Sequence, residues 1–182
     1  MDEQTTYIAL LRGINVGGHR PLKMEELRQM FVMLGFENVS TYIQSGNVVF
    51  DAADQDESQL ATKIKNQIAD TFEYDVPMII CTVEQLQKTL AELPFQKRES
   101  WKRYISFLSE QPNEKKQQKL VSQSNEIECF KMGNLVVYAH IDKETDQKQQ
   151  FSTSFIERTL KVSVTNRNLR TVRKILTLAS SR

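Results

Sequence analysis

The sequence predicts an α+β fold of two ferredoxin-like (β-α-β-β-α-β) units in tandem, with mainly antiparallel sheets and helices packed on one face. Three observations lead to this prediction. Short apolar runs alternate with helical periodicity in the order β-α-β-β-α-β-α, and the same order begins again after residue 95. The strand and helix expected within residues 76–93 align at a constant offset with residues 162–179. The string Gly46–Phe50 (GNVVF) also resembles Gly133–Tyr138 (GNLVVY), which indicates an internal duplication. One continuous mixed sheet is the alternative.

The first predicted unit spans residues 1–95, and several of its element boundaries carry residues typical of such positions. Pro21 lies near the start of the first helix and Gly35 just past its end. Gly46 can adopt the positive φ that a tight hairpin turn requires. Thr82 is the expected N-cap of the third helix, because its hydroxyl can accept a backbone hydrogen bond. Strands are expected at 7–11, 39–43, 47–50 and 76–81, and helices at 22–34, 60–72 and 83–93.

The second predicted unit spans residues 96–182 and starts with a charged connector at Lys97–Glu99. Its longer helices carry apolar residues at three-and-four spacing, as amphipathic helices do. Its two middle strands form a hairpin around Met132–Asn134, and Asn166–Asn168 is expected to be a loop before the last helix. Strands are expected at 104–108, 126–130, 135–140 and 162–165, and helices at 112–122, 151–160 and 168–179.

Two loops of the first unit are expected to lie side by side. In a split βαβ unit the first two strands are parallel, so the segments that follow them leave the sheet at the same end. These segments are the glycine-rich loop at residues 12–19 and the hairpin turn at residues 44–47. The predicted loop at residues 166–168 leaves the fourth strand of its own unit at the opposite end.

Composition limits the classes of function. A chain of 182 residues can bury a stable core without disulfides. Cys81, Cys129, His19 and His140 lack the spacing of a zinc site, so we expect neither a metal nor a cofactor. Cys81 follows an apolar run and is expected to be a core or strand-end thiol, and His140, at the end of a strand, is expected to be an ordinary edge residue. No apolar run reaches the roughly 18 residues of a membrane span, and no signal peptide is recognisable, so a cytoplasmic protein without a membrane partner is expected.

The charge of the chain is divided unevenly between its halves. The formal net charge is +1, but residues 1–95 contain 7 basic and 14 acidic residues, a balance of −7. Residues 96–182 contain 17 basic and 9 acidic residues, a balance of +8. This basic half is expected either to complement the acidic first unit, within the chain or between chains, or to meet a polyanion.

Two strings resemble a known family. Leu10–Gly18 (LLRGINVGG) and Thr41–Phe50 (TYIQSGNVVF) are similar to the bacterial family called domain of unknown function 1697, as is the C-terminal block at Thr165–Asn168. The resemblance implies a cytoplasmic protein of two ferredoxin-like units, and it implies no activity. Two positions depart from the family pattern: Leu169 replaces the usual Trp, and residues 143–154 lack the usual Gly-x-x-Arg-Ser run.

The candidate site is an anion-binding site. Arginine guanidinium groups, side-chain amides and free glycine N–H groups are all donors that recognise phosphate or carboxylate. The alternative is a purely structural loop in which Arg12 pairs with Glu25 or Glu26. The predicted ligand-binding residues are Arg12, Asn15, Gly17, Gly18, Gln44, Ser45 and Asn47, with Arg167 and Asn168 from the second unit.

Three function hypotheses remain open at the level of sequence. The first is the binding of a small anion, a nucleotide or organic phosphate, by an enzyme or a sensor. The second is a nucleic-acid-binding module that uses the basic C-terminal unit, and the third is a protein-interaction module without a small-molecule site. No catalytic residue is assigned: Ser45 lacks a nucleophile-elbow context, and His19 is the only nearby group that titrates near neutral pH. The sequence leaves the reaction and any homo-oligomer open.

Overall fold

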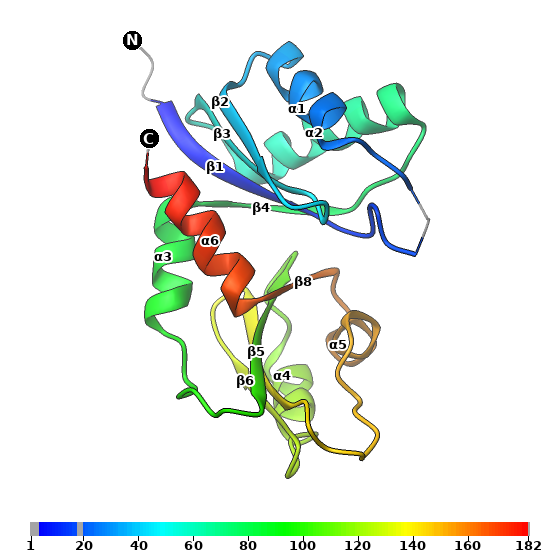
Figure 1. Ribbon diagram of the computed structural model, residues 1–182, viewed down its shortest axis with the longest axis vertical. Helices are drawn as coiled ribbons and strands as arrows, with labels where there is room; N and C mark the ends of the chain where they lie inside the picture. Colours follow the sequence, from blue (N-terminus) through cyan, green and yellow to red (C-terminus); the bar gives the residue numbers. More distant parts are fainter. Residues whose placement is uncertain (1–3, 18–19, 182) are drawn as a thin grey trace. The chain divides into compact units, whose positions relative to one another are not determined.

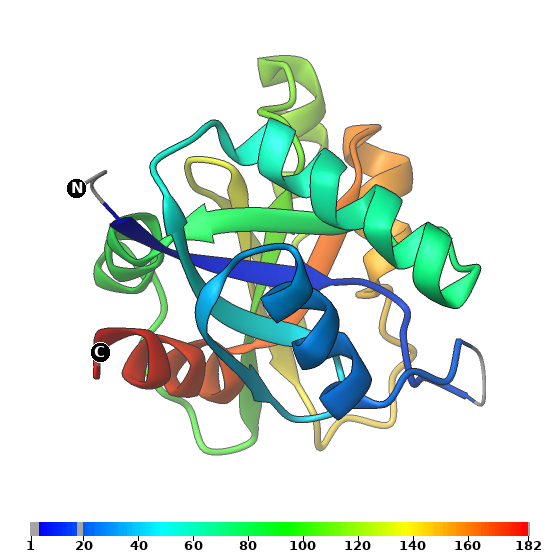
Figure 2. The same ribbon diagram turned by 90° about the horizontal axis from the view of Figure 1, so that it is seen from above.

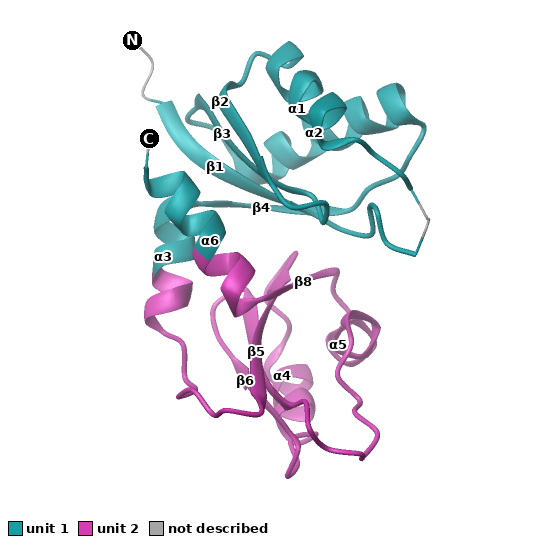
Figure 3. Cartoon of the chain, viewed as in Figure 1, with its two compact units in different colours: residues 1–87, 174–182 teal, residues 88–173 magenta. Residues whose placement is uncertain are grey.

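The computed structural model describes residues 4–17 and 20–181, and the chain divides into two compact units (Figures 1 and 3). Unit 1 comprises residues 1–87 and 174–182, and unit 2 comprises residues 88–173. The ranges expected from the sequence are 1–95 and 96–182. The structural division differs because its boundaries fall within helices, and because residues 174–182 belong to unit 1.

Unit 1 contains a four-stranded antiparallel sheet in the order β2-β3-β1-β4. This order is that of a split βαβ unit, because β1 stands in the middle and pairs with both β3 and β4. Its elements are β1 (Gln4–Leu11), α1 (Met24–Met33), β2 (Glu37–Tyr42), β3 (Asn47–Ala53), α2 (Glu57–Phe72), β4 (Met78–Thr82) and the start of α3 (Val83–Ala91).

The core of unit 1 lies between the sheet and helices α1 and α2, which cover the same face (Figures 1 and 2). Alternate residues of each strand point to this face, so Tyr7 and Phe50 join Phe31 of α1 and Ile64 of α2 in one buried cluster. The ring of Phe50 stacks on Tyr7 at a centroid distance of 5.9 Å and meets Phe31 edge-on at 5.2 Å. This apolar burial fixes the register of the strands, because a slip by one residue would turn the same side chains away from the helices.

Unit 2 repeats the topology, with a second antiparallel sheet in the order β6-β7-β5-β8. Its core cluster includes Phe130 and Val137 from the sheet, Leu120 from α4 and Ile156 from α5. Its elements are the end of α3, β5 (Trp101–Leu108), α4 (Glu114–Val121), β6 (Glu128–Met132), β7 (Val136–Asp142), α5 (Thr153–Leu160), β8 (Val164–Asn168) and the start of α6 (Leu169–Ser180), whose remaining residues belong to unit 1. The predicted α+β fold of two tandem ferredoxin-like units is therefore confirmed.

The two segments aligned at a constant offset are equivalent in structure. β4 and β8 each pass directly into the next helix, α3 and α6, without an intervening loop. Thr82 accepts a hydrogen bond from Gln85 N at 3.2 Å, and Asn168 accepts one from Thr171 N at 2.8 Å. Thr82 is thus the N-cap that the sequence predicted. The prediction of a loop at Asn166–Asn168 is wrong, because the strand extends up to the capping residue.

The similar glycine-asparagine strings, in contrast, are not equivalent. The N–H of Leu11 at the end of β1 donates to Gly46 O at 2.8 Å, and the N–H of Leu108 at the end of β5 donates to Leu135 O at 2.9 Å. Gly46 therefore corresponds to Leu135, two residues beyond Gly133. Both residues have a positive φ, 76° at Gly46 and 54° at Leu135, so the turn geometry repeats although the glycine does not.

Candidate functional site

The glycine-rich loop and the hairpin turn lie side by side, as the sequence predicted. Asn15 Nδ2 donates a 2.9 Å hydrogen bond to Gln44 O, which joins the two segments directly. The 2.8 Å bond from Leu11 N to Gly46 O joins them again at the strand ends. The expectation followed from topology alone, because β1 and β2 run in the same direction in this fold.

Asn15 braces the loop from within. Its backbone is left-handed, with φ 54°, and its side chain makes three hydrogen bonds of 2.8–2.9 Å. Nδ2 donates to Leu22 O and Gln44 O, while Oδ1 accepts from Leu22 N. Both amide hydrogens of Asn15 are therefore committed within the protein, so Asn15 acts as a positioning residue.

The hairpin turn is held by the same kind of bond. Asn47 is 0 % exposed, and its Nδ2 donates to Tyr42 O at 2.9 Å and to Ser45 Oγ at 3.0 Å. A Cβ added to Gly46 would lie 2.7 Å from Leu11 Cβ and from Ile14 Cδ1, so this position accepts only glycine without rearrangement. Asn47 and Gly46 maintain the turn on which Gln44 and Ser45 are displayed.

Two arginines border the loop. Arg12 directly follows β1, and its side chain is half-buried. Arg20 places its Nη1 3.4 Å from the position that a Cβ on Gly13 would occupy, and within the described residues it forms no ion pair. Sequence reasoning missed Arg20, because it lies outside the matched glycine string and only the loop conformation brings it back to Gly13.

The acidic side chains considered as partners of Arg12 form other ion pairs. Glu25 contacts Arg28, and Glu26 contacts Lys23 Nζ at 3.0 Å. Each pair joins residues three apart, one pair within α1 and the other between α1 and the residue that precedes it. Their side chains are largely solvated, so they contribute little to stability.

The outer part of the loop pair is solvated and carries both polar and apolar groups. Gly17 has a φ of 59° and is exposed, as is Gln44 on the turn. Val16 and Ile43 are exposed large apolar side chains, one on each segment. Gly18 and His19, which the sequence analysis considered for the site, lie outside the described residues.

Arg167 and Asn168 belong to unit 2. Arg167 is 8 % exposed, pairs with Ile105 in the sheet register, and donates from Nη1 to Asn166 O at 2.9 Å. Burial lowers the pKa of Arg167 to about 10, so the guanidinium stays charged at neutral pH. The side chain of Asn168 caps α6, a structural role that the sequence analysis did not assign to it.

The remaining expectations concern cysteine, histidine, metals and membranes. Cys81 is a buried free thiol, as predicted, whereas His140 is buried on the central strand β7 and is not an edge residue. Across the described ranges, no three His, Cys, Asp or Glu side chains group as metal ligands. In the same part of the chain, no helix combines the length and the apolar character needed to cross a bilayer.

Comparison with protein families decides the relationship that the two strings indicate. Residues 4–138 match the family described as protein of unknown function (DUF1697). The chain belongs to this family. The match to DUF1697 includes both loops of unit 1 and ends within β7, so it does not include the C-terminal block at residues 165–168.

A solved structure extends the likeness over nearly the whole DUF1697 chain. A conserved bacterial protein from Streptococcus pneumoniae superposes with a TM-score of 0.72 at 28% sequence identity. The alignment covers 97% of this chain and 99% of the pneumococcal chain. Among curated proteins, no sequence matches this one.

Proposed function

We propose that this DUF1697 protein binds a small anionic ligand, an organic phosphate or nucleotide, at the paired loops of unit 1. The supporting observation is that two arginines, Arg12 and Arg20, border a loop whose conformation is fixed by hydrogen bonds. A guanidinium group binds phosphate or carboxylate through two parallel N–H donors, which gives both affinity and orientation. Gln44 and Ser45 add further polar groups on the adjoining turn.

Preorganisation favours binding at this place. The side chain of Asn15 bonds to Leu22 and Gln44, so the loop around Asn15 is already held in place when a ligand arrives. The side-chain amide hydrogens of Asn15 and Asn47 are hydrogen-bonded within the protein. We therefore assign the ligand contacts to Arg12, Arg20 and Gln44 and to the exposed backbone N–H groups.

The exposed apolar side chains narrow the class of ligand. Val16 and Ile43 stand on the two adjoining segments beside the polar groups. An organic phosphate or nucleotide has an anionic part for the arginines and an apolar or aromatic part for these side chains. An inorganic anion would contact only the arginines, so it should bind more weakly than an organic phosphate.

Thermal unfolding with a panel of nucleotides and phosphorylated metabolites tests the proposal. A true ligand at about 100 times its Kd should stabilise the protein by about 2.7 kcal/mol, because only the folded state binds it. Arg12→Gln and Arg20→Gln should each weaken binding about tenfold or more, since each removes a charge-assisted hydrogen bond.

Arg28→Gln is the matched control, because Arg28 is a half-buried arginine of unit 1 that pairs with Glu25 on the surface of α1. It should leave ligand affinity unchanged. The proposal fails if no phosphorylated compound stabilises the protein, or if Arg12→Gln and Arg20→Gln bind as well as the unaltered protein.

A protein partner at the same loops is the second candidate, and the exposed Val16 and Ile43 favour it. Val16→Ser with Ile43→Ser would then abolish binding to that partner while Arg12→Gln would have a small effect. The reverse ranking is expected for a small anion.

A further inference from the structure

One buried polar atom in unit 2 lacks a partner. Within the described residues, Nε2 of His140 makes no hydrogen bond, although the side chain is only 3 % exposed. An unsatisfied buried polar atom is uncommon in folded proteins, so its surroundings call for a physical explanation. His140 lies on β7, directly between Arg103 on β5 and Cys129 on β6 in the sheet register.

Two aromatic rings cover His140. The ring of Phe95, from the connector between α3 and β5, lies 5.1 Å from the imidazole at an angle of 31°. The ring of Trp101, at the start of β5, meets it edge-on at 4.8 Å. Both aromatic residues are themselves partly solvated, so this cluster reaches the surface of unit 2.

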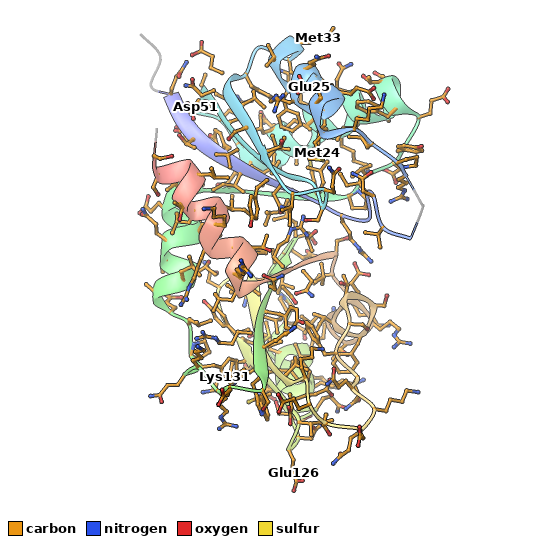
Figure 4. All side chains as sticks on the ribbon, viewed as in Figure 1. Met24, Glu25, Met33, Asp51, Glu126 and Lys131 are labelled. Carbon is orange, nitrogen blue, oxygen red and sulfur yellow. The ribbon has the colours of Figure 1, made fainter. Side chains whose placement is uncertain are left out.

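Three cations surround these rings. The guanidinium of Arg98 lies 5.0 Å from the Trp101 ring centre, and the ammonium of Lys131 (Figure 4) lies 5.6 Å from the Phe95 ring centre. Arg103 Nη1 donates to Phe95 O at 3.2 Å. In the part of the chain that the structure describes, none of the three forms an ion pair with a carboxylate.

Arginine charges act on both His140 and Arg103. Burial lowers the pKa of His140, and the charges of Arg98 and Arg103 lower it further. Burial and the charge of Arg173 also lower the pKa of Arg103. The charged or titratable groups around His140 are Arg98 from the connector, Arg103 from β5, Lys131 and Cys129 from β6, and Tyr138 and Asp142, each two positions away on the same face of β7. Arg173 of α6 adds its charge through Arg103.

We propose that Arg98, Arg103 and Lys131 form an anion-binding site for the phosphate group of a small molecule, with His140 as its proton-linked residue. A dianion among the three cations would offset their mutual repulsion and favour a proton on His140. By thermodynamic linkage, protonation of His140 then strengthens anion binding as the pH falls. The site lies in unit 2 and does not depend on the function proposed for the loops of unit 1.

Trp101 makes the site directly measurable, because it is the only tryptophan in the chain and contacts both Arg98 and His140. Titration of the full-length protein with inorganic pyrophosphate should change the Trp101 fluorescence with saturation. The double variant Arg98→Gln with Lys131→Gln should raise the Kd about tenfold or more, since each residue gives up a charge-assisted contact.

Lys102→Gln together with Lys97→Gln is the matched control. Both lysines are exposed, and they neighbour Arg103 and Arg98 in sequence. Lys102 alternates to the other face of β5, and this variant has the same net charge as the double variant above. It should change the Kd less than about twofold if the contact geometry matters, and as much as the first variant if only overall charge matters.

The proton linkage is tested with sulfate, which keeps two charges across the working pH range. An imidazolium quenches a neighbouring tryptophan. Lowering the pH without sulfate should therefore reduce Trp101 fluorescence, with a midpoint below pH 6.5. Saturating sulfate should move that midpoint upward, and His140→Gln should remove the transition.

The proposal is overturned if the midpoint does not move with sulfate, or if the double variant binds pyrophosphate like the unaltered protein. Binding of a single-stranded oligonucleotide without any response to pyrophosphate would also overturn it in favour of a nucleic-acid surface. Pyrophosphate binding that survives in Arg12→Gln and is lost in the double variant separates this site from the loops of unit 1.

Discussion

At the scale of single residues, several groups predicted to bind ligand prove to hold the loops in place. Asn47 is the clearest case, because it is fully buried and both of its amide hydrogens are used within the turn. Asn47→Ala should reduce the free energy of unfolding by about 1–3 kcal/mol, since it removes the donor to the part-buried carbonyl of Tyr42. Chemical denaturation followed by circular dichroism measures this loss.

Asn134→Ala is the matched control at residue scale. Asn134 has the same local sequence context after a glycine, but it lies in the exposed part of its turn. Its substitution should change the stability by less than about 0.5 kcal/mol. Equal losses in the two variants would contradict the assignment of Asn47 as the buried brace.

Arg20 shows a functional candidate that no local pattern marks. Arg12 could be predicted because it adjoins the glycine string, and Asn15 and Gln44 because they carry amides on predicted loops. Arg20 lies eight positions beyond Arg12 and comes close to Gly13, and among the described residues between them Asn15, Gly17 and Arg20 itself have left-handed backbone. Such a reversal depends on the closed loop as a whole.

At the scale of elements, the junctions of β4 with α3 and of β8 with α6 show the repeat most directly. Asn168 caps α6 through a 2.8 Å bond to Thr171 N. Asn168→Ala should lower stability by about 1 kcal/mol, whereas Asn168→Asp should keep it, because a carboxylate also accepts at an N-cap. Thermal and chemical unfolding of both variants measure the difference.

The same pair of variants separates the two roles of Asn168. If Asn168 also donates to an anion, the Asn168→Asp variant would keep its stability but lose ligand affinity, because the carboxylate offers no donor and repels the ligand. Equal stability losses for Ala and Asp would argue against the capping role.

The hairpins show where element-level pattern matching fails. The strings GNVVF and GNLVVY predicted the duplication correctly but assigned the wrong partners. Val137 pairs with Ser106 and faces the core, as Val48 pairs with Ala9, so the true alignment is shifted by two residues from the match of Gly46 with Gly133. Pairing with the central strand sets this register, and the turn strings do not contain that information.

At the scale of the whole molecule, each unit contains one free thiol. Cys81 lies in unit 1 and is 7 % exposed, and burial together with the charge of Glu57 raises the pKa of its thiol to about 12. Cys129 lies in unit 2 and is partly exposed. In the native protein at pH 8, Cys81 should resist thiol reagents, because almost none of it is thiolate.

Mass spectrometry after timed labelling in increasing denaturant tests this expectation. Cys129→Ser leaves Cys81 as the only probe, and its labelling should follow the unfolding of unit 1. The Cys81→Ser variant reports Cys129 alone. Rapid labelling of Cys81 without denaturant would show that its side chain is not buried in the native protein.

The fold of this protein was determined by features that the sequence states locally. Elements and turns are marked by apolar periodicity and by Gly35, Gly46 and Thr82, which act through backbone geometry and capping over a few residues. The adjacency of the two loops followed from the order of those elements. The roles of individual side chains were decided only in the tertiary structure, because burial depends on distant parts of the chain. In that structure Asn47 holds the hairpin turn, Arg20 lies close to Gly13, and His140 is enclosed by aromatic rings and cations.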